Sequence, residues 1–240
     1  MNLAISDNLS GFDVAYWPIV RDTETSSSAY YCDPILTDSD GNSLIGDDVL
    51  LLGSKERVLD QATLAKNLQS MLNSVFRFLN ERQIAGETPR LIIPLNSVAL
   101  SVESVSTVFA DICREIDKEF SGQMVFEIFN FKDRLTIDQL DKIGILVFPF
   151  CRHYIARPSP GMTDFKIFAN TNFQGVSFDL MNKPWPVDRI KPHLEKFCNS
   201  AEINRLALYI NGVATKEVYD LALDLGFKYM NGSGVQSAQQ

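Results

Sequence analysis

Four side chains able to bind a metal ion or transfer a proton lie at or near the ends of predicted strands. They are Glu127, Cys151, His153 and Asp179. Thiols and imidazoles bind zinc, and carboxylates serve as general acids or bases. The Cys151–His153 spacing matches no standard zinc module, however, and the sequence has no GxSxG nucleophile motif. An enzyme built on these residues is therefore one alternative, which no motif requires.

Length, charge and cysteine usage narrow the class of protein. The chain has 240 residues, 45% of them hydrophobic, which suits one large α/β domain with a sizeable core. The net charge of −8 argues against binding to nucleic acid or anionic membranes. No apolar run is long enough to span a membrane. The four cysteines, Cys32, Cys113, Cys151 and Cys198, are scattered, so we expect reduced thiols and a cytoplasmic location.

Short β-rich runs alternate with helical patterns along most of the chain. The longest helical pattern covers residues 58–79, where apolar residues recur every three or four positions. Thr136 and Gln139 have the spacing of a capping box that opens a helix. The predicted strands are 12–20, 29–32, 91–95, 124–129, 145–148, 175–179, 205–210 and 227–230. This alternation predicts an α/β fold, a TIM-like (β/α)8 barrel with one antiparallel strand from an N-terminal hairpin.

The expected organisation is a single barrel domain with a short tail at each end. We assign residues 1–11 to an N-terminal tail and residues 12–232 to the barrel. Residues 233–240 are small and polar, and we expect them to form a flexible tail.

The C-terminal part of the sequence carries a family resemblance. The segment 208–213, followed by Ala214 and then by Leu225-Gly-Phe-Lys-Tyr-Met-Asn-Gly232, resembles the end of a bacterial EAL domain, in which AEGVET precedes a helix and LGxxYxQG. Residues 16–20 are similar to the family's opening YQPIV, and residues 90–100 align without a gap to a segment of the type RLSVNLSARQL. EAL domains are cyclic di-GMP phosphodiesterase modules, so the resemblance implies a barrel of that type.

The resemblance also places a vestigial pocket at the C-terminal ends of the strands. Glu127 falls on the first acid of the EITE motif and Asp179 on the acid of KID. Asn211 stands where the family has an acid, and Asn231 replaces the glutamine of YxQG. Phe150, with Cys151, takes the place of two neighbouring metal-binding aspartates. A site for two divalent cations needs several carboxylates. We therefore expect no bound metal, no cofactor and no phosphodiesterase activity.

Three functions follow from this pattern of retained spacing and lost acids. The first is an inactive, degenerate EAL-like domain that regulates bacterial signalling through a protein partner, whose identity the sequence does not give. The second is a non-hydrolysing cyclic di-GMP receptor, although the resemblance predicts binding weaker than about 100 μM because the phosphate-contacting positions are apolar or neutral. The third is the enzyme alternative, in which Cys32, Cys151 and His153 meet as soft ligands. A homodimer is compatible with each of them.

Overall fold

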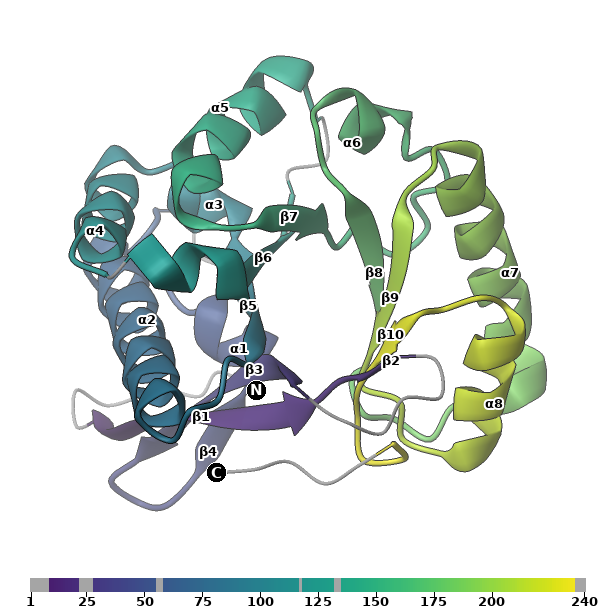
Figure 1. Cartoon of the computed structure of the whole chain (residues 1–240), viewed down its shortest axis with the longest axis horizontal. Helices are drawn as coiled ribbons and strands as arrows, with labels where there is room; N and C mark the ends of the chain where they lie inside the picture. The colour runs from purple at the N-terminus through teal and green to yellow at the C-terminus, as the bar shows by residue number, and fades with distance from the viewer. Residues whose placement is uncertain (1–8, 22–27, 55–57, 117, 132–134, 236–240) are drawn as a thin grey trace.

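The strands curl into a ring that helices surround from outside (Figure 1). The structure, a computed structural model, describes residues 9–21, 28–54, 58–116, 118–131 and 135–235. Hydrogen-bonded neighbours follow the order β1-β3-β5-β6-β7-β8-β9-β10-β2, and β4 pairs with β3. Because β1 and β2 are separated only by Ile19, this order returns to its starting point and the barrel is nearly closed.

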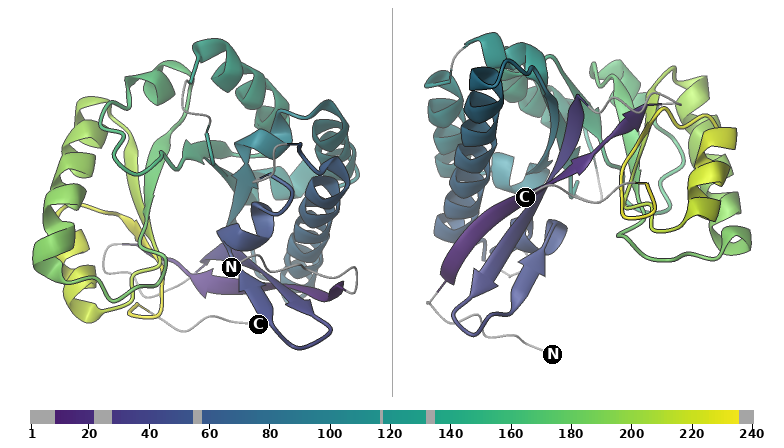
Figure 2. Two further views of the ribbon diagram at one scale, coloured as in Figure 1. Left: turned by 180° about the vertical axis from the view of Figure 1, so that it is seen from behind. Right: turned by 60° about the horizontal axis from the view of Figure 1, so that its bottom comes forward.

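The strands have the following bounds. They are β1 (Leu9–Pro18), β2 (Val20–Arg21), β3 (Ala29–Asp38), β4 (Ser43–Ile45), β5 (Arg90–Asn96), β6 (Met124–Phe129), β7 (His153–Ala156), β8 (Gly175–Asp179), β9 (Ala207–Asn211) and β10 (Tyr229–Met230). β1 runs antiparallel to β3, as does β2 to β10, whereas the pairs from β3–β5 round to β9–β10 are parallel. The predicted barrel with an antiparallel strand from an N-terminal hairpin is confirmed. The β3–β4 hairpin extends beyond the ring (Figure 2).

The longer helices cover the outer face of the sheet, whereas the short first helix, residues 47–50, lies at the barrel mouth (Figure 1). They are α1 (Asp47–Leu50), α2 (Gln61–Ile84), α3 (Ser97–Leu100), α4 (Glu103–Arg114), α5 (Ile137–Val147), α6 (Lys166–Asn170), α7 (Val187–Ile203) and α8 (Lys216–Asp224), with 3-10 turns η1 (Lys118–Gln123) and η2 (Phe148–Phe150). Asp60 caps α2 by accepting a hydrogen bond from the Thr63 amide at 3.1 Å. The buried stripe of α2 packs on the hairpin, where the rings of Tyr16 and Phe78 stack at 3.8 Å.

The alternation of side chains along the strands produces an outer and an inner layer of the core. Outward-facing residues pack against the helices, and inward-facing ones fill the ring. The inner cluster consists of Ile19, Tyr31, Ile92, Val125, Ile155 and Tyr209. Polar side chains replace apolar ones above this layer, near the C-terminal ends of the parallel strands, and this change creates the candidate site.

One predicted strand is wrong, and the error moves part of the candidate site. Residues 145–147 lie in α5, not in a strand, and Phe148 begins η2. The predicted capping box at Thr136 opens this helix. One face of the helix is buried up to its last residue, through Leu140, Ile143 and Val147. The strand of this unit is β7, which begins only at His153.

The ends of the barrel differ from the predicted domain bounds. β1 begins at Leu9, inside the predicted N-terminal tail, while residues 1–8 lie outside the described part of the chain. Gly234 donates its amide to the Val213 carbonyl at 2.8 Å, and Val235 packs against the core. Residues 233–235 are therefore attached to the barrel, and residues 236–240 lie outside the described part.

Candidate functional site

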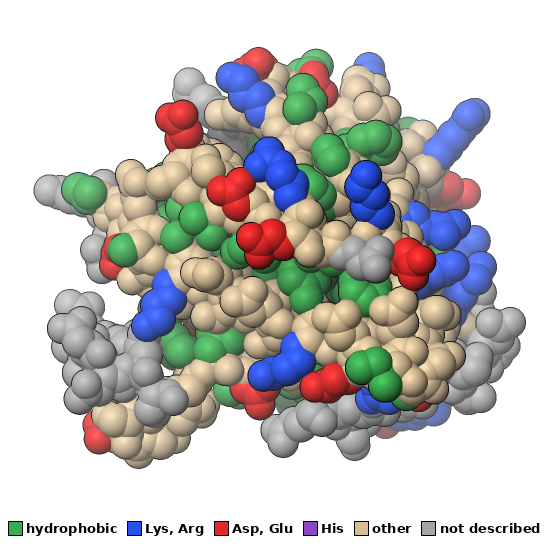
Figure 3. All heavy atoms as spheres, turned by 60° about the vertical axis from the view of Figure 1, so that its left-hand side comes forward, with side chains coloured by type: hydrophobic (Ala, Val, Ile, Leu, Met, Phe, Trp, Pro, Cys, Tyr) green, Lys and Arg blue, Asp and Glu red, His purple; other side chains and the backbone are tan. Residues whose placement is uncertain are grey.

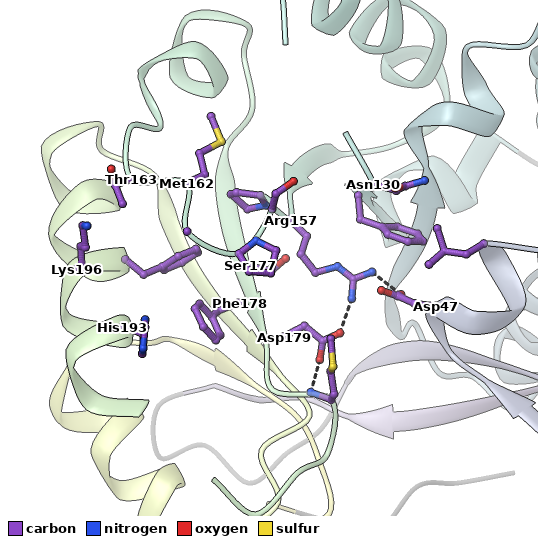
Figure 4. A pocket seen from close by; sticks show the side chains of 18 residues that line it. Asp47, Asn130, Arg157, Met162, Thr163, Ser177, Phe178, Asp179, His193 and Lys196 are labelled. Carbon is purple, nitrogen blue, oxygen red and sulfur yellow. Dashed lines mark hydrogen bonds and ion pairs between the residues drawn. The ribbon is translucent and has the colours of Figure 1, made fainter. Parts of the chain in front are cut away.

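A buried arginine lies at the centre of the barrel mouth. Arg157 is the first residue after β7, and only 7% of its side chain is exposed. Its guanidinium bonds Asp47 of α1 and Asp179 of β8 at 2.6 Å each, and its Nε lies 3.5 Å from Glu127 of β6. It also lies over the ring of Phe129, with 4.4 Å to the ring centroid. Arg157 thus joins acids from widely separated parts of the sequence into one carboxylate cluster. Figure 4 shows its bonds to Asp47 and Asp179.

Glu127 is enclosed by hydrogen-bond donors as well. Its side chain is fully buried. The Tyr31 hydroxyl donates to Oε2 at 3.0 Å, and the Asn211 amide donates to Oε1 at 2.8 Å. Asn231 donates in turn to Asn211 at 2.7 Å, and its own oxygen accepts from the Gly212 amide at 3.2 Å. A buried carboxylate with partners on both oxygens is held in one orientation.

The surroundings of the cluster shift its acid–base equilibria. Burial raises the pKa of Asp47 to about 6, against the opposing effect of Arg157. Burial also raises the pKa of Asp33, to about 6, despite its hydrogen bond from Trp17. For Arg157, burial disfavours the charged form, but Glu127 and the neighbouring acids outweigh it and raise its pKa well above its usual range. The guanidinium is therefore charged at every physiological pH.

The structure brings together most of the residues predicted for the vestigial pocket. Glu127, Asp179, Asn211 and Asn231 are linked through the hydrogen bonds and ion pairs of the cluster. Phe150 is a correction. It lies in η2, before β7, and its ring packs edge-on against Phe109 of α4, with centroids 5.9 Å apart.

Cys151 shares this displacement, because it too precedes β7 and donates its thiol to the Val147 carbonyl. The end of β7 that faces the mouth carries Arg157 instead. Where the resemblance implies metal-binding aspartates, this chain has Arg157. Sequence analysis missed this residue, and the only signal was an arginine directly before a proline-rich loop.

The soft-ligand alternative finds no support in the geometry. Within the described residues, no three His, Cys, Asp or Glu side chains are grouped so as to hold a metal ion. Cys32 is buried in the layer between strands and helices, and burial raises its thiol pKa well above the usual range. Burial likewise raises the pKa of Cys151 to about 12, so neither thiol is a ready nucleophile.

The carboxylate cluster does not fit a divalent cation either. Magnesium and similar ions need carboxylate oxygens free to coordinate them. Here Asp47, Glu127 and Asp179 already bind Arg157. A divalent ion 4 Å from the guanidinium would be repelled by about 8 kcal/mol at an effective dielectric constant of about 20.

A cavity of about 510 Å³ adjoins the cluster. The loop 157–163, β8 and α7 contribute most of its lining, together with Asp47 and Phe129 (Figure 4). Its size suits a small organic ligand.

Comparison with known proteins identifies the fold. No protein-family model matches this sequence, and neither does any curated protein. Solved structures do match. The EAL domain of FimX from Pseudomonas aeruginosa, bound to c-di-GMP, is similar with a TM-score of 0.70 and 14% identity over 95% of this chain and 90% of that one. This chain has the EAL-domain fold.

Other EAL structures agree at similarly low identity. The PaMucR phosphodiesterase in complex with c-di-GMP has a TM-score of 0.76 at 10% identity, covering 95% of this chain and 92% of that one. Bacillus subtilis YkuI, solved with c-di-GMP and calcium, has a TM-score of 0.67 at 12% identity, covering 95% of this chain and 55% of the larger protein. Within the described residues of this EAL-like chain, no helix is long and apolar enough to cross a bilayer.

Proposed function

We propose that this chain is a catalytically inactive EAL-like module that regulates bacterial signalling in the cytoplasm by binding another protein. The observation that carries the proposal is the occupation of the carboxylate cluster by Arg157. The guanidinium supplies the positive charge that the acids require, and it cannot activate a water molecule as a metal ion does. The EAL framework then persists without phosphodiester hydrolysis.

The exposed face of α5 supports a role in protein binding. Ile145 and Phe148 are 76% and 65% exposed, and Ile137 at the start of the helix is 53% exposed. A groove of about 450 Å³ between α3 and α5 is lined by Leu100, Phe131 and other apolar residues. This side of the molecule presents hydrophobic side chains among charged ones (Figure 3). Apolar side chains grouped on one face are typical of interaction surfaces.

A paired experiment tests the proposal. Calorimetric titration with cyclic di-GMP should show no binding tighter than about 100 μM, or about 5 kcal/mol. Affinity purification from the native host should recover a protein in stoichiometric amount with the wild-type chain, and far less of it with Phe148→Glu. The matched control is Val58→Glu, which changes an 80% exposed residue elsewhere on the surface and should retain the partner.

The second candidate is a cyclic di-GMP receptor that does not hydrolyse its ligand. What favours it is that the similar FimX and YkuI structures both contain c-di-GMP. In that case the titration would show low-micromolar binding of cyclic di-GMP by both the wild-type chain and Phe148→Glu. The purification would recover no protein that is lost when Phe148 is replaced by glutamate.

A further inference from the structure

The cavity beside the carboxylate cluster contains an unsatisfied hydroxyl. Along β8, Val176 and Phe178 pack toward the helix-side core, so Ser177 between them faces the interior of the ring. Ser177 is 1% exposed and lines the cavity. In the part of the chain that the structure describes, its Oγ is the one buried side-chain nitrogen or oxygen without a hydrogen-bond partner. A buried hydroxyl left unpaired costs free energy, which a ligand with a polar group can recover.

The rim of the same cavity carries a lysine. Lys196 and His193 lie one turn apart on α7, and both are exposed (Figure 4). Within the described residues, Lys196 has no ion-pair partner. The single charge of Arg157 is outnumbered by the three acids of the carboxylate cluster, so that side of the cavity does not attract an anion. The rim therefore favours a ligand with one negative charge.

Between the rim and Ser177 the walls are mainly apolar. They include Phe129, Phe178, Phe197 and Met162, with prolines 158 and 160. Such walls favour a hydrophobic ligand body, and the cavity of about 510 Å³ is large enough for a small organic molecule. A cyclic dinucleotide has two phosphates and large polar bases, so it does not match this arrangement.

We propose that this cavity binds a small carboxylate with an apolar body and a hydroxyl or carbonyl group at the far end. Lys196 pairs with the carboxylate at the rim, and Ser177 hydrogen-bonds the distal group. The proposal is independent of the proposed function, because it requires neither a protein partner nor the absence of hydrolysis.

Titration calorimetry with ω-hydroxyoctanoate, octanoate and octanediol tests the proposal. We expect ω-hydroxyoctanoate to bind about fivefold more tightly than octanoate, because only it satisfies Ser177. Lys196→Gln should weaken both carboxylates about tenfold and leave octanediol unchanged. The matched control is Lys191→Gln, on the same helix, since Lys191 pairs with Glu195 and does not line the cavity; it should have no effect.

Ser177→Ala completes the design. This variant keeps the size of the side chain, and thermal melting checks that it folds. It should remove the preference for ω-hydroxyoctanoate over octanoate without weakening octanoate. Failure of all three compounds to bind overturns the proposal, as does carboxylate binding that Lys196→Gln leaves unchanged. An unaltered preference in Ser177→Ala overturns the assignment of the distal group.

Discussion

Replacing Arg157 by alanine should remove the cation that holds the carboxylate cluster together. The guanidinium is 7% exposed and contacts acids at 2.6, 2.6 and 3.5 Å. Removing one partner of a buried ion pair costs about 3–5 kcal/mol, because the remaining charges stay buried and uncompensated. We therefore expect Arg157→Ala to lower the free energy of unfolding by that amount, measured by urea denaturation at pH 7.5.

The matched control is Arg114→Ala. Arg114 also bonds an aspartate, Asp111, at 2.7 Å, but both side chains are more than half exposed. Exposed pairs contribute about 0–1 kcal/mol, so this variant should unfold nearly as the wild type does. If Arg157→Ala costs no more than Arg114→Ala, the cluster is not held by Arg157 and the reasoning fails.

The pH dependence of Arg157→Ala gives a second readout. The folded-state pKa of Asp47 is already raised to about 6 by burial, and loss of the neighbouring cation should raise it further. The folded variant then binds more protons than the unfolded chain does, and so it gains stability as the pH falls from about 7.5 toward 5. The difference in free energy of unfolding between variant and wild type should therefore become smaller over that range. A difference that becomes larger as the pH falls would contradict the electrostatic explanation.

Three further predictions concern stability. Burial raises the pKa of Asp33 to about 6, so the folded state binds its proton more tightly and the wild-type free energy of unfolding should fall as pH rises from about 4 to 6. In urea titrations, Asp33→Asn should therefore be more stable than wild type at pH 7.5 and equal to it at pH 4. A variant that is less stable than wild type at pH 7.5 would contradict the pKa shift. Gly212→Ala would place a Cβ 2.6 Å from a backbone nitrogen at φ +68, so it should cost about 3 kcal/mol in thermal melts, against about 1 kcal/mol for Gly86→Ala, whose added Cβ meets nothing within 4 Å. Tyr31→Phe removes the 3.0 Å hydrogen bond to Glu127 and should lower the free energy of unfolding, measured in urea, by about 1–2 kcal/mol. An unchanged free energy would show that this hydrogen bond does not stabilise the fold.

Local signals in the sequence were sufficient to predict much of the barrel's secondary structure. β6 and β8 have the predicted bounds, because both are short apolar runs between turn signals. The capping box is formed, with the Gln139 amide donating to Thr136 Oγ1 at 3.3 Å and the Thr136 amide donating to Gln139 Oε1 at 3.1 Å.

Periodicity failed where a helix and a strand were both short and apolar. The run 145–148 is as hydrophobic as a buried strand, but residues 145–147 form the end of α5, where Val147 is buried and Ile145 is exposed. β7 has only four residues and begins with His153, so it gave a weak signal. This misplacement carried Phe150 and Cys151 to the wrong end of the strand and concealed Arg157.

The pairing of Arg157 with its acids was not predictable from local sequence. Asp47 lies 110 positions away and Asp179 lies 22 away. An arginine before a proline-rich loop is usually exposed, and only the closure of the ring makes this one buried. The charge balance of the site is thus a property of the tertiary structure.

The measurement that tests the central claim most directly is a hydrolysis assay. The purified chain is incubated with cyclic di-GMP and magnesium or manganese, beside an active EAL phosphodiesterase, and the products are separated by chromatography. Because Arg157 occupies the acids that would hold the metal, we expect no linear product above the enzyme-free blank. Linear product that forms with the wild-type chain and disappears with Glu127→Ala would contradict the account.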